Sequence, residues 1–205
     1  AIRNSFIYAL STLFISVLLG TLAVYALNKK SKMGRALDIL LMLPLGTSAV
    51  TLGLGYIIFF NRLPIDTHVY PFLIPLAHSL VALPFVVRSM QPAILSIPPS
   101  LRQAAVVQGA APWRVWREVD LPIILRAALV AAIFAFTISL GEFGATTFLA
   151  RPAYPTMPVA IYRFLSQPGA LNYGQAMAMA TLLLATCGVS IAVLEWLQKP
   201  GQKYL

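Results

Sequence analysis

Five long apolar stretches constrain this 205-residue chain more than any other feature of its sequence. A helix needs roughly 20 mainly apolar residues to cross the hydrocarbon core of a bilayer. Helices also satisfy their own backbone hydrogen bonds inside lipid. We therefore expect an all-α fold, a polytopic transmembrane helical bundle of five spans that forms one domain over residues 1–205. The predicted spans are residues 5–27, 37–60, 71–90, 123–150 and 173–196.

The composition supports a membrane protein and explains the basic charge. Hydrophobic residues make up 59% of the chain and charged residues 10%, whereas soluble domains have about 45–50% and 25%. A soluble domain and a disordered chain are therefore both excluded. The net charge of +9 would also suit nucleic acid, but eleven of the fifteen Lys and Arg residues fall on one side of the predicted bundle.

This charge bias predicts the orientation of the chain. Basic residues concentrate in cytoplasmic loops of membrane proteins. The amino terminus is therefore expected outside and the carboxyl terminus in the cytoplasm. The eleven residues are Lys29, Lys30, Lys32, Arg35, Arg88, Arg102, Arg114, Arg117, Arg126, Lys199 and Lys203, and the four on the other side are Arg3, Arg62, Arg151 and Arg163.

The segment 91–122 is too polar to insert and has the pattern of two short helices. Ser100 precedes Gln103 by three residues, which predicts a capping box at the start of the first helix. Gly109 is placed to end that helix in the left-handed conformation. Pro112 suits the first turn of the second helix, and Leu121-Pro122 is expected to close it.

The second of these helices carries two tryptophans three residues apart, Trp113 and Trp116, which can share one face. Aromatic residues and arginines are frequent anchors of protein contacts, so we expect the loop to dock on a cytoplasmic partner. Two helices around a glycine also occur in DNA-binding domains, but this loop lies between two spans and has no third helix to complete such a domain. A solvated loop without a partner is the other alternative.

The spacing Gln103-Ala104-Ala105, three residues, Gly109, nine residues, Val119, one residue, Leu121-Pro122 resembles the "EAA" loop of binding-protein-dependent ABC importer permeases. Two positions depart from that pattern: glutamine replaces the glutamate and valine replaces an isoleucine. The change to Gln103 removes the charge with which the family's glutamate would make a salt bridge.

Four other segments are similar to the ferric-iron and thiamine permease branch of that family. In that branch two such cores are often fused, so the chain is expected to be one half of a fused permease. The segments are 42–45, 54–56, 139–144 and 156–162.

The resemblance implies a permease subunit in the inner membrane of a prokaryote. It would pass a solute delivered by a binding protein, with iron(III) as the first expectation and thiamine, sulfate or phosphonates as alternatives. The partners implied are ABC ATPase subunits, a second permease core, the substrate-binding protein and the lipid bilayer, with no nucleic acid. ATP would be bound and hydrolysed by the ATPase, because this chain has no phosphate-binding G-x-x-x-x-G-K-[ST] motif. The chain itself would be no enzyme and hold no cofactor or metal. The implied ATPase-coupling residues are Ser100, Gln103, Ala104, Ala105, Gly109, Pro112, Trp116, Leu121 and Pro122.

Polar and helix-bending residues inside the spans predict a translocation pathway. Glu142 is a charge in apolar surroundings, and such residues usually face a cavity or a partner helix. It would either line the pathway or its outer gate, or make a structural hydrogen bond to a neighbouring span or to the partner core. Asp38 is expected to pair with Lys32 or Arg35. The pathway candidates are Pro44, Gly46, Ser139, Glu142, Thr146 and Thr147.

Other assignments for the same residues are plain packing for Pro44 and Gly46, and a buried hydrogen-bonding role for His78. A secondary transporter or channel would need more intramembrane charges or inverted repeats. A membrane-embedded enzyme would need paired catalytic side chains within the spans, and the sequence shows none.

Overall fold

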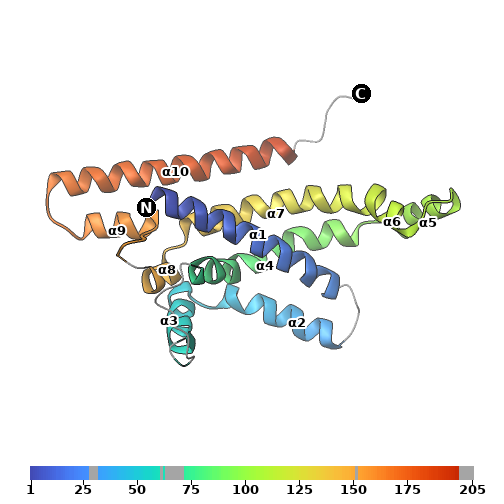
Figure 1. The fold of residues 1–205 in the computed structure, drawn as a ribbon, viewed down its shortest axis with the longest axis horizontal. Helices are drawn as coiled ribbons and strands as arrows, with labels where there is room; N and C mark the ends of the chain where they lie inside the picture. The colour runs from blue at the N-terminus through green and yellow to red at the C-terminus, as the bar shows by residue number, and fades with distance from the viewer. Residues whose placement is uncertain (28–31, 61, 63–71, 151, 199–205) are drawn as a thin grey trace.

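The structure is a computed structural model that describes residues 1–27, 32–60, 62, 72–150 and 152–198 (Figure 1). Within these ranges the regular elements are all helical, which confirms the expected fold class. Lys29, Lys30, His68, Pro71, Arg151, Lys199 and Lys203 lie outside them. The elements are α1 (Ile2–Leu27), α2 (Lys32–Met42), η1 (Leu43–Gly46), α3 (Ala49–Phe60), α4 (Leu73–Leu95), α5 (Pro99–Val107), α6 (Pro112–Val115), η2 (Trp116–Asp120), α7 (Leu121–Gly141), α8 (Gly144–Leu149), α9 (Met157–Leu165) and α10 (Ala170–Gln198).

Three helices, α1, α4 and α7, form the centre of the molecule. The buried face of α1 carries mostly small residues at intervals of four, such as Thr12, Ser16 and Gly20. The buried residues of α7 include Ala127, Ala131 and Ala135. Lipid tails are as apolar as a helix surface, so packing in membranes depends on small residues that allow close approach. These sequence intervals therefore determine which faces meet.

The remaining helices lie around this centre. Figure 1 shows α10 running along one side, with α9 below its start and the α5–α6 segment projecting beyond the far end of the bundle. Helix α10 buries only Ala176 and Leu194 among its side chains. The start of α9 is joined to α1, because the backbone N–H of Met157 donates to the Ser5 hydroxyl over 2.7 Å.

The predicted second span is a bent pair of helices rather than one straight helix. By length and apolar composition four helices can cross a membrane, and the bent pair would make five. Its two parts, Lys32–Gly46 and Ala49–Phe59, meet at 110°. The expected bending at Pro44 is confirmed, because this proline lies in the 3-10 turn η1 that follows α2. Proline lacks the N–H that would continue an α-helix.

The predicted fourth span, 123–150, is wrong at both ends. Its helix stops at Gly141, Glu142 has an extended backbone, and α8 is a separate short helix. At the other end the helix starts at Pro112 and continues unbroken to Gly141. Leu121-Pro122 therefore does not close a second short helix.

A turn of π-helix explains how the chain passes Pro122. The backbone N–H of Leu121 donates to the carbonyl of Trp116, five residues back. A proline ring clashes with the carbonyl four residues before it in a regular α-helix. The wider turn at Trp116–Asp120 relieves that clash, so the helix continues.

The third span is also more regular than its prolines suggest. Pro84 and Pro92 lie inside α4, which runs to Leu95, so the polar loop starts at residue 96 and not at residue 91 as expected. Buried helices tolerate proline where neighbours satisfy the freed backbone groups. The assignment of residues 1–205 to a single domain stays a prediction.

Candidate functional site

The segment after α4 folds as a helical hairpin, which we call the coupling hairpin (α5, the turn at Gly109, α6 and η2). Gly109 has a φ of +82°, so it adopts the left-handed conformation that the sequence predicts. Its N–H donates to the carbonyl of Val106 over 2.9 Å, and that of Ala110 donates to Ala105 over 3.0 Å. These bonds close the end of α5.

The predicted capping box is not formed. Helix α5 begins at Pro99, its N-cap is Pro98, and no side chain caps it. Proline is pre-organised for the first helical position, so the helix starts two residues earlier than predicted and Ser100 lies inside its first turn. Ser100 and Gln103 are both exposed, and the Gln103 side chain makes no hydrogen bond to another described residue.

A half-buried ion pair braces the coupling hairpin. Arg102 Nε donates to Asp120 Oδ1 over 2.8 Å, and Asp120 is only 8% exposed. This pair joins α5 to the end of η2. Neither residue is among the predicted ATPase-coupling residues. An acid directly before Leu-Pro, with an arginine next to Gln103, was the available signal.

The tip of the coupling hairpin exposes apolar and aromatic side chains. The rings of Trp113 and Trp116 stack with centroids 4.9 Å apart, as their spacing predicts. Trp113 is 67% exposed and Val107 87% exposed. Pro112 is at the first position of α6, as expected. Ala104 and Pro122 are also exposed, while Ala105, Trp116 and Leu121 are half-buried.

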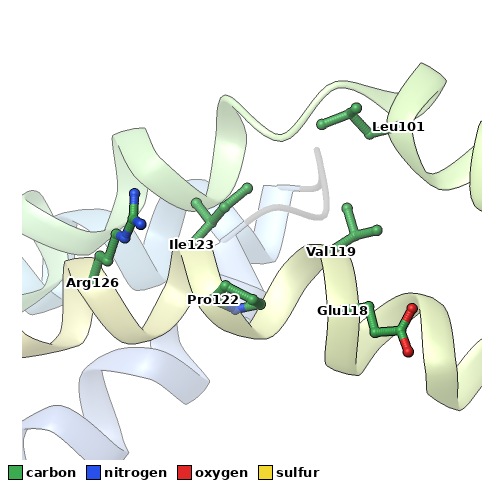
Figure 2. A pocket seen from close by; sticks show the side chains of 6 residues that line it. All are labelled: Leu101, Glu118, Val119, Pro122, Ile123 and Arg126. Carbon is green, nitrogen blue, oxygen red and sulfur yellow. The ribbon is translucent and has the colours of Figure 1, made fainter. Parts of the chain in front are cut away.

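A hollow of about 330 Å³ lies between the base of the coupling hairpin and the start of α7. Figure 2 shows Leu101 facing Val119 across it, with Ile123 and Arg126 further along α7. Glu118, on its rim, pairs with Arg114 over 3.4 Å. The hollow lies between α5 and the helix that continues from η2 into α7, and the Arg102–Asp120 pair joins α5 to η2 beside it.

At the other end of α4 a group of buried polar side chains comes together, which we call the polar hub (Thr12, His78, Ser139 and Thr146). His78 is 1% exposed. Its Nδ1 lies 2.7 Å from the Ser139 hydroxyl and its Nε2 lies 2.6 Å from the Thr146 hydroxyl. The hydroxyls of Ser139 and Thr12 are 3.2 Å apart. His78 thus has the expected buried hydrogen-bonding role.

Glu142 lies beside the hub and is 8% exposed. Its Oε1 accepts a hydrogen bond of 2.8 Å from the backbone N–H of Ala145. This local bond is not the expected bond to a neighbouring span, and the pathway role of Glu142 stays a prediction. Thr147 is exposed and donates to the carbonyl of Phe143.

The structure brings together only some of the pathway candidates. Ser139, Glu142 and Thr146 meet at the break between α7 and α8. Pro44 and Gly46 are half-buried and exposed, respectively, at the bend of the second span. Thr12 and His78 complete the group, and the pathway prediction did not include them because they lie on helices distant in sequence.

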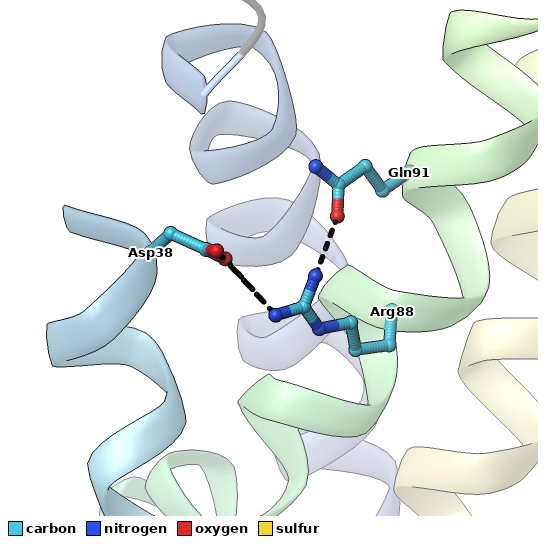
Figure 3. Close-up of polar contacts among 3 residues, drawn as sticks. All are labelled: Asp38, Arg88 and Gln91. Atoms are coloured by element: carbon cyan, nitrogen blue, oxygen red, sulfur yellow. Dashed lines mark hydrogen bonds and ion pairs between the residues drawn. The ribbon is translucent and has the colours of Figure 1, made fainter. Parts of the chain in front are cut away.

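Asp38 pairs with Arg88 of α4 rather than with Lys32 or Arg35. The shortest oxygen-to-nitrogen distance is 3.3 Å, and Arg88 also donates to Gln91 Oε1 over 3.2 Å (Figure 3). Arg35 lies three residues before Asp38 on the same helix. The packing of α2 against α4 decides the partner instead. Among the described residues, no group of three or more His, Cys, Asp and Glu side chains could hold a metal ion.

Comparisons with known proteins identify the family of this chain. The sequence model of a family described as "Binding-protein-dependent transport system inner membrane component" matches residues 3–200. The molybdenum transport system permease protein ModB of Haemophilus influenzae is 38% identical over 133 residues, covering 63% of this chain and 57% of that protein. ModB of Escherichia coli K12 is 35% identical over 127 residues, covering 60% and 55%. The chain thus matches somewhat more than half the length of these two relatives.

Two further similarities cover more of the chain. The putative 2-aminoethylphosphonate transport system permease protein PhnV of Salmonella typhimurium is 28% identical over 190 residues, covering 92% of this chain and 71% of that protein. A crystal structure of an amino acid ABC transporter has a TM-score of 0.50 at 15% identity, covering 91% of this chain and 90% of that one. ModB and PhnV are named for the transport of molybdenum and of 2-aminoethylphosphonate, so these relatives do not support the expectation of iron(III). The family match over nearly the whole chain shows that this protein belongs to the inner membrane components of binding-protein-dependent transport systems.

Proposed function

We propose that the chain is the permease subunit of an ATP-driven importer that receives a solute from a binding protein and passes it into the cytoplasm. The observation that carries this proposal is the coupling hairpin. It projects beyond the bundle with an exposed apolar tip and is braced by the Arg102–Asp120 pair. An ABC ATPase is the expected partner for that tip.

The connections of the coupling hairpin suit the transmission of force. Helix α5 follows α4 after only residues 96–98, and α6 continues through η2 into α7 as one helix of 30 residues. A rigid helix moves as a unit, so displacement of the tip would move α4 and α7 together. Both helices belong to the central packing of the bundle.

Gln103 stands where the EAA loop of the family has a glutamate, and the Gln103 side chain is exposed. A neutral amide both donates and accepts hydrogen bonds but forms no ion pair. We therefore expect Gln103 to contact the ATPase through hydrogen bonds. Ser100, Ala104, Pro112 and Trp116 would supply the remaining contact surface, with Gly109 shaping the turn.

The other proposed partners are a second permease core, the binding protein and the lipid bilayer. Helices α1 and α10 have many exposed large apolar side chains, Phe14 and Leu184 among them. Exposed apolar surface of this extent requires lipid or another protein. A second core would be a fused half or a separate subunit.

For the substrate we propose a small tetrahedral oxyanion, of the molybdate or phosphonate type, in place of iron(III). The relatives' names support this choice. Two carboxylates also support it, because both already have partners. Asp38, in the bent second span, pairs with Arg88, and Glu142, between α7 and α8, accepts from a backbone N–H. A pathway for an anion would avoid free carboxylates, because like charges repel.

The test uses the substrate-binding protein that delivers solute to this permease in the proposal. Calorimetric titration should show binding of molybdate or 2-aminoethylphosphonate and no binding of ferric ion or thiamine. Ferric binding without oxyanion binding would contradict the substrate proposal. The permease role is tested separately: the liganded binding protein should stimulate ATP hydrolysis by the reconstituted complex, and failure of the ATPase to co-purify with this chain would overturn that role.

A further inference from the structure

The polar hub bridges the only break in the 112–149 helical segment of the described chain. Ser139 lies on α7 just before the break at Glu142, and Thr146 lies on α8 just after it. The two ring nitrogens of His78 contact these two hydroxyls over 2.7 Å and 2.6 Å. The His78 imidazole, on α4, therefore contacts both α7 and α8.

Both ring nitrogens of His78 have a hydroxyl partner. The Thr146 hydroxyl donates to the carbonyl of Glu142 over 3.1 Å and lies 2.6 Å from Nε2. The Ser139 hydroxyl donates to that of Thr12 over 3.2 Å and lies 2.7 Å from Nδ1. A buried ring with a hydrogen-bond partner at each nitrogen is held in one orientation.

Helix α8 is in turn packed tightly against α3, the second half of the bent span. A Cβ atom placed on Gly144 would lie 2.9 Å from the Cβ of Ala49. One placed on Gly53 would lie 2.7 Å from the Cα of Ala145. Such close backbone contact makes α3 and α8 move as one piece, because packed interiors transmit displacement.

We propose that His78 is a positioning residue that ties the α3–α8 pair to α4, so that movement of the coupling hairpin reaches α3 through α4. The proposal rests on the proposed permease function. It gives His78 a role in conformational coupling, beyond its packing. Replacing it should therefore leave ATP hydrolysis present while disconnecting α8 from the nucleotide state.

The experiment uses the reconstituted complex with a single cysteine on α8. Cys187 is replaced by serine and Thr147, which is exposed, by cysteine. The rate of N-ethylmaleimide labelling is compared between the nucleotide-free and the ATP–vanadate-trapped complex. We expect these rates to differ by about fivefold or more with His78 present, the usual size of an allosteric coupling. With His78→Leu the ratio should fall to about one while basal ATPase activity persists.

Matched variants keep the test decisive if His78→Leu does not fold. Thr146→Val removes one hydroxyl of the hub at nearly constant volume, and Thr146→Ser retains it. The valine variant should lower the labelling ratio and the serine variant should not. An unchanged ratio in His78→Leu or Thr146→Val would overturn the proposal, as would a nucleotide-independent rate in the unsubstituted hub. Stimulation of ATPase activity by the binding protein, measured in the same preparations, reports the permease function independently.

Discussion

Glycine is required for two different reasons at two positions of the chain. At Gly109 the requirement is conformational, since φ is +82° and a Cβ would meet no atom within 4 Å. At Gly20 the requirement is space, because a Cβ there would collide with Val86 of α4. The first determines the shape of the coupling hairpin and the second the distance between α1 and α4.

Substitution of Gly109 should impair coupling without unfolding the bundle. A β-branched residue in the left-handed region costs about 1–2 kcal/mol, so Gly109→Val should favour a different turn and move the tip. We expect solute transport and binding-protein-stimulated ATPase activity to fall together, with normal membrane insertion. Gly109→Asp should also lower both activities, because it adds a negative charge to the exposed turn.

Gly109→Asn is the control, because asparagine adopts the left-handed conformation more readily than other side chains. It should retain more activity than the valine variant. Equal activity of the valine variant and the unsubstituted protein would show that the turn conformation is unimportant for coupling.

At the level of elements, apolar length and helix continuity are separate properties. The stretch 37–60 is long enough to span a membrane, yet it bends by 110°. The bend places α3 against α8, and the two short helices meet through Gly53 and Gly144. The small residues in these elements thus serve helix contact as well as bending.

Two glycines of α3 should respond oppositely to alanine. Gly53→Ala forces Ala145 to move, and overpacking of this kind costs about 1–3 kcal/mol. Gly55→Ala meets nothing within 4 Å and gains about 0.5–1 kcal/mol of helix propensity. The thermal midpoint of the detergent-solubilised complex should therefore fall for Gly53→Ala and stay level or rise for Gly55→Ala. Equal midpoints would contradict the close α3–α8 contact.

For the whole molecule, the prediction concerns orientation in the membrane. The charge bias predicts that α10 starts outside and ends in the cytoplasm. Leu171 and Gln198 are exposed at its two ends. In a Cys187→Ser background, an impermeant maleimide added to intact spheroplasts should label Leu171→Cys. It should label Gln198→Cys only in inside-out vesicles, and the reverse pattern would contradict the orientation.

Much of the architecture could be predicted from local sequence. Apolar runs predict the long helices because the bilayer sets their length, and Gly109 and Pro112 predict the turn of the coupling hairpin because their backbone preferences are local. Prolines were less reliable as signals of where a helix ends. Pro84 and Pro92 lie within α4, and Pro122 lies within a helix that widens into a π turn to pass it.

The sequence by itself determined that the chain is a helical membrane protein with a polar loop of family-specific spacing. Only the tertiary structure decided the partners of the polar side chains: Asp38 with Arg88, Arg102 with Asp120, and His78 with Ser139 and Thr146. The reason is physical. Helix formation depends on neighbours along the chain, whereas each of these contacts depends on how separate helices pack through their small residues.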